Sequence, residues 1–337
     1  LRPDGTPLQS YPGFEFIRQF TERSDGKVLP ERYLTAAHPD FVLHAMETGE
    51  PYPVRALIVE ATNPLLTYGD THRVFNALMS LDLIVVLDYF MSVTASIADY
   101  VLPAAQAMER PTFQAHGGVA NIGYGGPAAV EPYYERKTDY DFFRLLGLRL
   151  GQAEFWPDET FADALRTTLA PAGMSYEEYC ETGIYTRKPD YYKHLRVDES
   201  GRYLGFGTST GLVELASEEL TALGGQRLPL PGEPAVLCTG DTLAKGAHLK
   251  LVTGSRKQPY NASMYFNNAA FRKQVSVPVV EMSAATAEKL GFAAGDCVHL
   301  GTDNGQARFQ VKLAKMRDDL LSADYGWWHP EYTPGAP

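Results

Sequence analysis

The sequence is poor in cysteine, in long apolar runs and in positive charge. Its cysteines, Cys180, Cys238 and Cys297, are far apart and form no CxxC pair. This spacing indicates neither a disulfide framework nor a thiolate metal site, so each is expected to be a small buried side chain. No apolar run approaches the ~18 residues that a membrane-spanning helix needs. The net charge of −11 disfavours nucleic acid and anionic membrane surfaces as main partners.

An initiator methionine and a signal sequence are also missing, since the chain begins Leu1-Arg2-Pro3. We therefore expect a processed or shortened form of a longer protein, and either a periplasmic or a cytoplasmic location stays open. The length of 337 residues predicts two domains. Apolar residues make up 45% and charged residues 21% of the sequence, which is typical of a folded globular protein.

Two short apolar runs organise the first domain. Residues 56–59 and 83–87 are almost entirely apolar, as expected of parallel strands that are buried on both faces. The intervening segment 70–80 has apolar residues at helical spacing, and Asp70 is placed to cap that helix. Because a helix connects the two strands, they are expected to be parallel. Residues 100–102 predict a third short strand.

An amide and a carboxylate come after the first two strands. Asn63 follows the first strand and Asp88 follows the second. The carboxyl ends of parallel strands share one edge of the sheet, where open α/β sheets bind their ligands. An amide beside a carboxylate suits a ligand with hydrogen-bond donors along one edge, such as a purine. The alternative is purely structural: Asn63 begins a turn at Pro64, and Asp88 caps the next segment.

A composition change divides the chain into two predicted domains. We expect an α/β domain over residues 1–224, with a helical insertion over roughly 150–200. A linker rich in glycine and proline covers residues 225–247. The remaining residues, 248–337, are expected to form a small β-barrel with one or two helices.

Caps and turn signals mark further elements of the α/β domain. Helices are predicted after Thr138, Thr160 and Ser175, each of which is followed three residues later by an acidic residue. The glycine-rich segment 116–127 is expected to be a long loop. The turn-rich segment 205–215 is expected to run into a strand.

The last hundred residues alternate between apolar and polar side chains. A strand is predicted over 249–253, and a helix begins after Ser283 and ends at Gly291. A tight hairpin turn is predicted at 303–305, followed by a half-buried strand over 307–313. This pattern underlies the predicted barrel.

Several of these motifs, in this order, resemble a known family. "VEATNPLLTYGDTHRVFNAL" and "LDLIVVLDYFMSVTASIADYVLPAA" are similar to the third domain of the molybdopterin guanine dinucleotide oxidoreductases, the dimethyl sulfoxide reductase family. "LVTGSRKQPYNASM" and "MSAATAEKLGFAAGDCVHLGTDNGQ" resemble its fourth domain. "FGTSTGLVELAS" and "GWWHPE" resemble the branch that holds thiosulfate and polysulfide reductases and acetylene hydratase. The resemblance covers about residues 54–331 and implies an α/β fold, in which a Rossmann-like parallel-sheet domain is followed by a double-psi β-barrel.

The resemblance also implies a cofactor, namely two molybdopterin guanine dinucleotides (bis-MGD) around one molybdenum or tungsten. The positions that match the family's cofactor contacts are Asn63, Leu87, Asp88, Arg110, Asp139, Thr253, Gly254, Arg256, Ser263 and Trp328.

The first five of these positions match contacts to one nucleotide. Asn63, Leu87 and Asp88 match residues at the guanosine. A carboxylate at position 88 can accept from guanine N1–H and from its exocyclic amine together, a pairing that adenine cannot supply. Arg110 and Asp139 match residues near the same nucleotide. Their alternative interpretations are a surface charge and an acid that the helix dipole favours.

The other positions match the pterin end. Residues 253–263 match a loop that reaches the pterins and phosphates. The family usually has Thr-Gly-Arg there, whereas in this sequence Ser255 separates the glycine from Arg256. Trp327 and Trp328 match an aromatic lining of the pterin, or else belong to the core.

The family's iron–sulfur cysteines and its metal ligand, which lie in its first two domains, have no match in the sequence. The resemblance therefore implies the C-terminal portion of a molybdenum or tungsten enzyme that supports redox chemistry on a small substrate. Its partners would be the remaining N-terminal domains and an iron–sulfur electron-transfer subunit. Two alternatives stay open: the same cofactor in a hydratase or transhydroxylase without net redox chemistry, and a nucleotide-binding module without catalysis.

Overall fold

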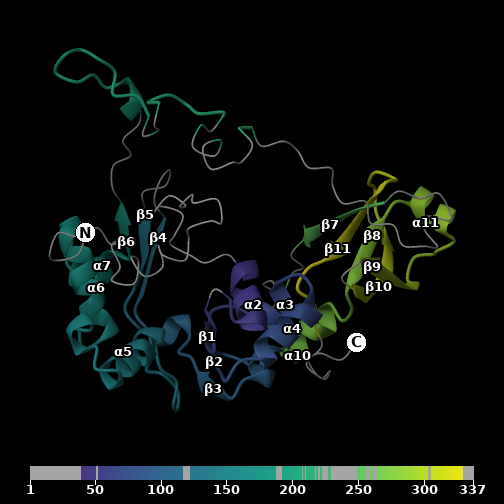
Figure 1. Ribbon diagram of the computed structural model, residues 1–337, viewed down its shortest axis with the longest axis horizontal. Helices are drawn as coiled ribbons and strands as arrows, with labels where there is room; N and C mark the ends of the chain where they lie inside the picture. Colours follow the sequence, from purple (N-terminus) through teal and green to yellow (C-terminus); the bar gives the residue numbers. More distant parts are fainter. Residues whose placement is uncertain are drawn as a thin grey trace. The chain divides into compact units, whose positions relative to one another are not determined.

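The fold is described from a computed structural model of the chain (Figure 1). The structure describes residues 39–50, 52–116, 122–186, 192–206, 210–216, 249–255, 264–302 and 305–328, together with residues 208, 218, 221, 227–228 and 259–260. The chain forms two compact units. The first combines residues 1–101 with residues 231–337, and the second consists of residues 102–230. Each unit is described by itself.

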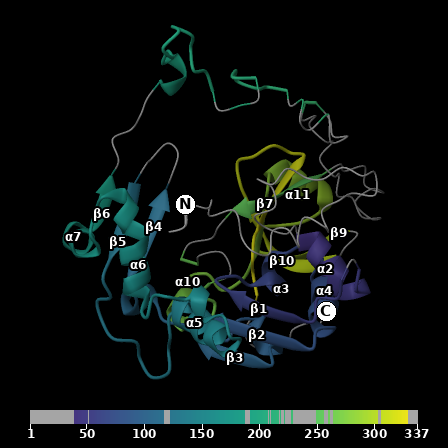
Figure 2. The ribbon, with the colours of Figure 1, turned by 60° about the vertical axis from the view of Figure 1, so that its left-hand side comes forward.

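A parallel sheet begins the first unit. Strands β1 (Ala56–Glu60), β2 (Leu83–Asp88) and β3 (Tyr100–Pro103) lie in the order β1-β2-β3 (Figure 2). β1 and β2 pair in parallel, with Ala56 opposite Leu83 and Glu60 opposite Leu87. This confirms the predicted strands and their direction. The predicted burial on both faces is wrong for β1, of which only Val59 is buried, because β1 is an edge strand.

Helices connect and cover the strands. They are α2 (Pro39–Thr48), α3 (Pro64–Thr67), α4 (Thr71–Met79) and the short 3-10 helix η2 (Ala95–Ile97). The predicted cap of α4 is confirmed, because the Asp70 carboxylate accepts a hydrogen bond from Arg73 N at 3.2 Å.

The core of this sheet region is a single apolar cluster between the strands and α2 and α4. Its fully or almost fully buried members are Leu43, Met46, Val59, Leu65, Val74, Ala77, Leu78, Ile84, Val86 and Ala95. The apolar spacing within α4 places Val74 and Leu78 on its buried face, in the same cluster as Val59 of β1 and Val86 of β2. The cluster fixes where β1 and β2 end, and therefore where the polar residues that follow them lie.

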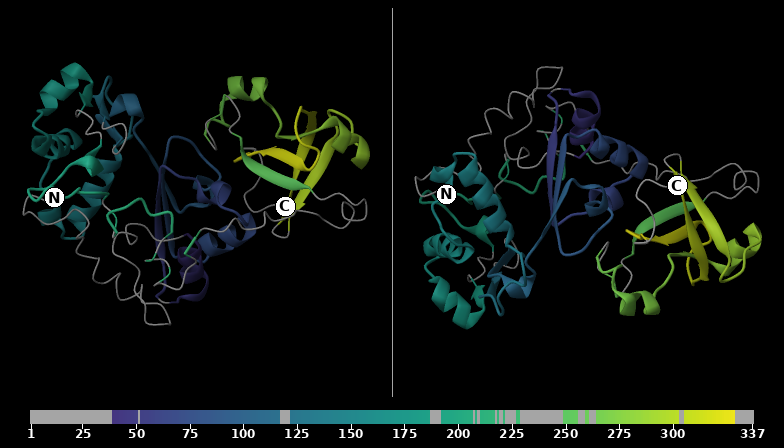
Figure 3. Two further views of the ribbon diagram at one scale, coloured as in Figure 1. Left: turned by 90° about the horizontal axis from the view of Figure 1, so that it is seen from above. Right: turned by 90° about the horizontal axis from the view of Figure 1, so that it is seen from below.

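The first unit also contains a mixed sheet that curls on itself. It consists of β7 (Lys250–Ser255), β8 (Val279–Met282), β9 (Cys297–Thr302), β10 (Gly305–Leu313) and β11 (Leu320–Asp324), in the order β7-β11-β8-β10-β9. β7 is parallel to β11 and β8 to β10, whereas β10 is antiparallel to β9 and β11 to β8. Figure 3 shows β7 and β11 running across the β9–β10 hairpin.

Helices α10 (Ala269–Gln274) and α11 (Ala284–Leu290) accompany this sheet. The predicted ends of α11 are confirmed. Ser283 Oγ accepts from Thr286 N at 3.0 Å, and Gly291 takes the left-handed conformation while Phe292 N donates to Ala287 O at 2.8 Å. The predicted β9–β10 hairpin is confirmed by the pair Thr302–Gly305, although residues 303 and 304 lie outside the described residues.

The second unit contains an antiparallel sheet and helices. β4 (Thr112–His116), β5 (Ile122–Gly126) and β6 (Ile184–Thr186) lie in the order β4-β5-β6, and α6 (Phe161–Leu169) and α7 (Tyr176–Thr182) lie beside them (Figure 1). α5 (Asp139–Arg149) precedes α6. The three predicted caps are confirmed, because the hydroxyls of Thr138, Thr160 and Ser175 accept from backbone N–H groups three residues ahead.

Three further sequence predictions are wrong. The expected loop over 116–127 is wrong for residues 122–126, which form β5 and pair with β4, while residues 117–121 lie outside the described residues. Gly125 is required there, because an added Cβ would lie 1.9 Å from Thr112 O. Residues 213–216 form no strand. Cys297 is exposed because it begins the edge strand β9, whereas Cys180 is half-buried and Cys238 lies outside the described residues.

The first prediction concerns this core. Leu78→Ala should lower the free energy of unfolding by about 2–5 kcal/mol, because it removes an almost fully buried side chain from this apolar cluster. Met79→Ala, at a position that is 54% exposed on the same helix, should change it by less than about 0.5 kcal/mol. Urea unfolding followed by circular dichroism measures both, and equal effects of the two substitutions would contradict the assigned core.

Candidate functional site

The loops after β1 and β2 meet at the carboxyl edge of the parallel sheet. Asn63 is 5% exposed, and its Oδ1 accepts hydrogen bonds from Thr94 N at 3.2 Å and from Thr94 Oγ1 at 2.5 Å. Thr94 Oγ1 in turn accepts from Leu65 N at 3.2 Å. No described residue accepts a hydrogen bond from Asn63 Nδ2. The oxygen of Asn63 is therefore used in hydrogen bonds within the fold, whereas its amide N–H donors have no described acceptor.

Backbone strain accompanies this junction. Ala61, between β1 and Asn63, has a φ of 52°, in the left-handed region that residues other than glycine rarely adopt. Strain of this kind costs about 1–3 kcal/mol and occurs most often at functional sites.

Asp88, at the end of β2, also divides its roles between its two oxygens. Its Oδ1 accepts from Tyr89 N at 2.6 Å and from Phe90 N at 3.2 Å, which caps the turn after the strand. No described residue donates to Oδ2. Leu87, its neighbour, is buried in the strand. One oxygen of Asp88 thus acts as the cap that the structural interpretation predicted. The other oxygen has no described donor and remains an acceptor.

The predicted pterin-end residues are described only in part. Thr253 is an exposed residue of β7 and pairs with Ala323 of β11. Gly254 also belongs to β7. Arg256 and Ser263 lie outside the described residues, so their predicted roles stay predictions.

Trp328 is half-buried at the edge of an aromatic cluster in the first unit. Its ring lies 6.3 Å from Phe266, which stacks on Tyr260 at 4.1 Å. The cluster extends to Tyr265, whose ring lies 6.0 Å from the ring of Phe90. Its members are Phe90, Tyr260, Tyr265, Phe266, Phe271, Trp327 and Trp328. Aromatic packing thus connects the loop after Asp88 with the segment that contains Trp328.

Arg110 and Asp139 belong to the second unit. Arg110 Nε is buried and has no hydrogen-bond partner in the part of the chain that the structure describes. Asp139 is the first residue of α5, and its half-buried carboxylate has no partner among the same residues. A buried guanidinium N–H without an acceptor is costly unless a ligand or water supplies one.

Glu109, beside Arg110, is a buried carboxylate with a full set of donors. It is 5% exposed and accepts from Gln106 N at 2.9 Å, from Arg136 Nη1 at 2.7 Å and from Tyr133 N at 3.3 Å. The bond from Gln106 N, together with those from Arg136 and Tyr133 N, lowers the pKa of Glu109 below its ordinary value, although burial opposes the shift. Glu109 thereby joins the segment of Arg110 to the segment before α5.

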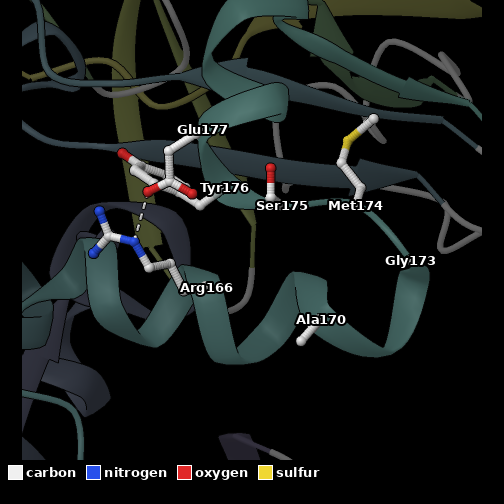
Figure 4. Close-up of a pocket in the computed structure, with 7 residues that line it drawn as sticks. All are labelled: Arg166, Ala170, Gly173, Met174, Ser175, Tyr176 and Glu177. Atoms are coloured by element: carbon white, nitrogen blue, oxygen red, sulfur yellow. Dashed lines mark hydrogen bonds and ion pairs between the residues drawn. The ribbon is translucent and has the colours of Figure 1, made fainter.

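A hollow between α6 and α7 in the second unit has a different character (Figure 4). Figure 4 shows Arg166 of α6 facing Glu177 of α7, with 2.8 Å between Nε and Oε1. The guanidinium also meets Asp163 Oδ1 at 2.7 Å. The hydrogen bond from Arg166 lowers the pKa of Glu177, whereas hydrogen bonds from the hydroxyl and N–H of Thr160, followed by the contact with Arg166, lower the pKa of Asp163. Because the charges satisfy one another, we assign this hollow to the junction of two helices and not to a ligand.

Within the described part of the chain, no cluster of three or more His, Cys, Asp or Glu side chains is placed to hold a metal ion. In the same part, no helix has the length and apolar character that a membrane crossing requires.

Comparisons with protein families match two segments of the chain. Residues 31–149 match the family described as "Molybdopterin oxidoreductase", and residues 249–336 match the "Molydopterin dinucleotide binding domain". All ten predicted cofactor positions lie within these segments. Asn63, Leu87, Asp88, Arg110 and Asp139 lie in the first, and Thr253, Gly254, Arg256, Ser263 and Trp328 lie in the second.

Individual relatives agree with these families. The acetylene hydratase of Syntrophotalea acetylenica is 32% identical over 98% of this chain and 45% of its own length. The dimethyl sulfoxide/trimethylamine N-oxide reductase of Rhodobacter capsulatus is 28% identical over 80% of this chain and 35% of its own length. The solved structure of acetylene hydratase from Pelobacter acetylenicus has a TM-score of 0.77, with 33% identity over 88% of this chain and 40% of that protein. The chain thus spans less than half the length of these relatives.

Sequence reasoning did not single out two residues that contact the candidate positions or their neighbours. Thr94 stands in a run of small hydroxyl residues, a pattern that reveals no partner for Asn63. Glu109 had no distinguishing pattern, because its donors come from segments up to 27 residues away.

The second prediction tests Glu109. Because its pKa is lowered in the folded state, its contacts stabilise the fold above the ordinary pKa of a glutamate and lose that effect as the pH falls through the lowered value. Glu109→Gln should therefore reduce the urea midpoint at pH 7, and its difference from the unmodified chain should shrink below about pH 4. The exposed Glu131→Gln should show no such dependence. A Glu109→Gln difference that is constant with pH would contradict the assignment.

Proposed function

The chain belongs to the molybdopterin oxidoreductase family and is homologous to acetylene hydratase and the dimethyl sulfoxide reductases, and from this we propose that it forms the molybdopterin dinucleotide-binding part of a molybdenum or tungsten enzyme. The observation that carries the proposal is the carboxyl edge of the parallel sheet. There, Asn63 and Asp88 each keep one polar atom that the described fold does not use.

The residues at this edge fit the guanine end of such a cofactor. Guanine presents a carbonyl acceptor beside two N–H donors, N1–H and the exocyclic amine. Asn63 Nδ2 supplies a donor for the carbonyl, and Asp88 Oδ2 supplies an acceptor for the N–H groups. Adenine has an amino group where guanine has its carbonyl, so the same pair of side chains disfavours it.

Arg110 fits an anionic part of the same cofactor. Its buried Nε has no described acceptor, and a phosphate oxygen is the kind of acceptor that a guanidinium prefers. We propose that Asp139, at the start of α5, takes a ribose hydroxyl or another donor of the nucleotide, because its carboxylate also has no described partner.

The curled mixed sheet is proposed to hold the pterin end as a double-psi β-barrel. The alternation of parallel and antiparallel strand pairs supports this topology. Thr253, Gly254, Arg256 and Ser263 would supply hydroxyls, a close-approach backbone and a positive charge, and Trp328 would supply an aromatic wall. We also propose that residues 1–224 form the α/β domain and residues 248–337 form the barrel domain, with a linker between them.

The proposed cofactor is bis-MGD with molybdenum or tungsten, which supplies two-electron or Lewis-acid chemistry at the metal. The residues of this chain bind and orient its dinucleotides. We propose that the metal ligand, any iron–sulfur cluster and the substrate pocket come from the rest of the enzyme, since the chain spans 45% of acetylene hydratase. An iron–sulfur electron-transfer subunit is proposed as a further partner.

The relatives suggest two candidate reactions for the complete enzyme. Redox of a small substrate is suggested by the dimethyl sulfoxide reductases, and hydration without net redox by acetylene hydratase, to which identity is higher, 32% against 28%. The complete enzyme should be assayed for both, using dimethyl sulfoxide with a reduced dye and acetylene with product analysis. Molybdenum, tungsten and guanosine monophosphate per polypeptide should be measured on the same sample. Absence of both metals and of guanosine monophosphate would leave only a non-catalytic module.

The third prediction isolates the acceptor at Asp88. Asp88→Asn retains the oxygen that accepts from Tyr89 N and Phe90 N but replaces Oδ2 by a donor. Because a hydrogen bond to a charged group contributes about 1.5–3 kcal/mol, the guanosine monophosphate released by acid from the complete enzyme should fall about tenfold or more. Metal content should fall in parallel.

The control for this prediction is Asp82→Asn. Asp82 forms a surface ion pair with Arg55, at 59% side-chain exposure, and lies immediately before the same strand. Its substitution should leave nucleotide and metal content unchanged. Equal contents in Asp88→Asn and Asp82→Asn would refute the guanine-binding role of Asp88.

A further inference from the structure

We propose that Thr94 is a positioning residue, which fixes the orientation of the Asn63 amide and so decides that the sheet edge presents a donor to the base. The proposal rests on the proposed function, because the ligand is taken to be the guanine end of the dinucleotide. Thr94 contributes no atom to that ligand. It acts through Asn63, to which both its backbone N–H and its hydroxyl donate.

The backbone of Thr94 removes the usual ambiguity of an amide side chain. An Asn can be turned by 180° to exchange its oxygen and nitrogen, so its orientation must follow from its partners. Thr94 N–H lies 3.2 Å from the Asn63 amide and can only donate. This long bond favours Oδ1 as the atom that faces it, with Nδ2 pointing the other way.

The hydroxyl of Thr94 strengthens the same choice. Thr94 Oγ1 accepts from Leu65 N at 3.2 Å, which leaves its own hydrogen to donate to Asn63 Oδ1 at 2.5 Å. Thr94 is 0% exposed, so water is not at hand to replace either bond. In the opposite orientation, the Asn63 nitrogen would face two donors within a buried site.

This polarity has a consequence for the ligand. With Oδ1 engaged, Asn63 offers only donors, and no described residue accepts from Nδ2. A base with a carbonyl at position 6, such as guanine or hypoxanthine, complements the donor. Adenine, with an amino group at that position, does not. Thr94 is thus inferred to determine selectivity for 6-oxopurines, whereas Asp88 recognises the N–H groups of guanine.

The fourth prediction is measured on the full 337-residue chain by calorimetric titration with GDP, IDP and ADP. The unmodified chain should bind GDP and IDP more tightly than ADP. Thr94→Val keeps the shape but removes the hydroxyl, and should weaken GDP and IDP about tenfold while leaving ADP unchanged. Thr94→Ser retains the hydroxyl and should restore GDP binding to within about threefold of the unmodified chain. Ser96→Ala, at an exposed hydroxyl of the same loop, is the matched control and should have no effect.

A second variant keeps the proposal testable if Thr94→Val does not fold, which near-UV circular dichroism will show. Asn63→Asp preserves the oxygen that faces Thr94 but places an acceptor where Nδ2 stood, so it should weaken GDP and IDP at least tenfold more than ADP. If the unmodified chain does not prefer GDP to ADP, the proposed function fails. If the preference exists and persists in folded Thr94→Val, the role of Thr94 is refuted. If it persists in Asn63→Asp, the Asn63 amide does not select the base, and the role of Thr94, which acts through that amide, is refuted with it.

Discussion

The parallel, in-register pairing of β1 with β2 is the constraint on which the site depends. Glu60 lies opposite Leu87, so both strands end at the same level and their following loops begin side by side. Only then can Asn63 reach Thr94 across the edge. A shift of one residue in this pairing would turn every side chain of one strand to the opposite face and separate the amide from the carboxylate. The buried cluster around Val74 and Val86 holds the register in place.

Several elements of the first unit were predictable because their signals are local. The apolar runs, the cap at Asp70 and the Schellman end at Gly291 each depend on neighbouring residues, and the structure confirms them. The bonds between Asn63 and Thr94 span 31 residues and leave no trace in local pattern. The hairpin of β4 and β5 was missed for a related reason. Its glycines are typical of a loop when the sequence is read alone. The structure shows why a glycine is required at position 125, because its backbone approaches the opposite strand closely.

Asn63 and Asp88 show why the structural and ligand-binding interpretations do not exclude each other. One oxygen of Asp88 caps a turn, and the oxygen of Asn63 joins two loops. These bonds immobilise the side chains before any ligand arrives, so less conformational entropy is lost on binding. The remaining atoms, Nδ2 and Oδ2, are of opposite hydrogen-bonding character. A turn residue held in this way is a better recognition element than one free to rotate.

The net charge of −11 disfavours an anionic ligand such as the proposed dinucleotide, and the placement of a few donors offsets this effect in the proposal. An acidic chain cannot attract a pyrophosphate through a broad positive field. The proposed binding would instead rest on a few donors placed where solvent is excluded, since a charge-assisted hydrogen bond is strongest there. Arg110, with a buried Nε that lacks a described acceptor, has this character, and Glu109 beside it is already neutralised by Arg136. The guanidinium of Arg110 is therefore not consumed by its acidic neighbour, and it retains the charge that a phosphate requires.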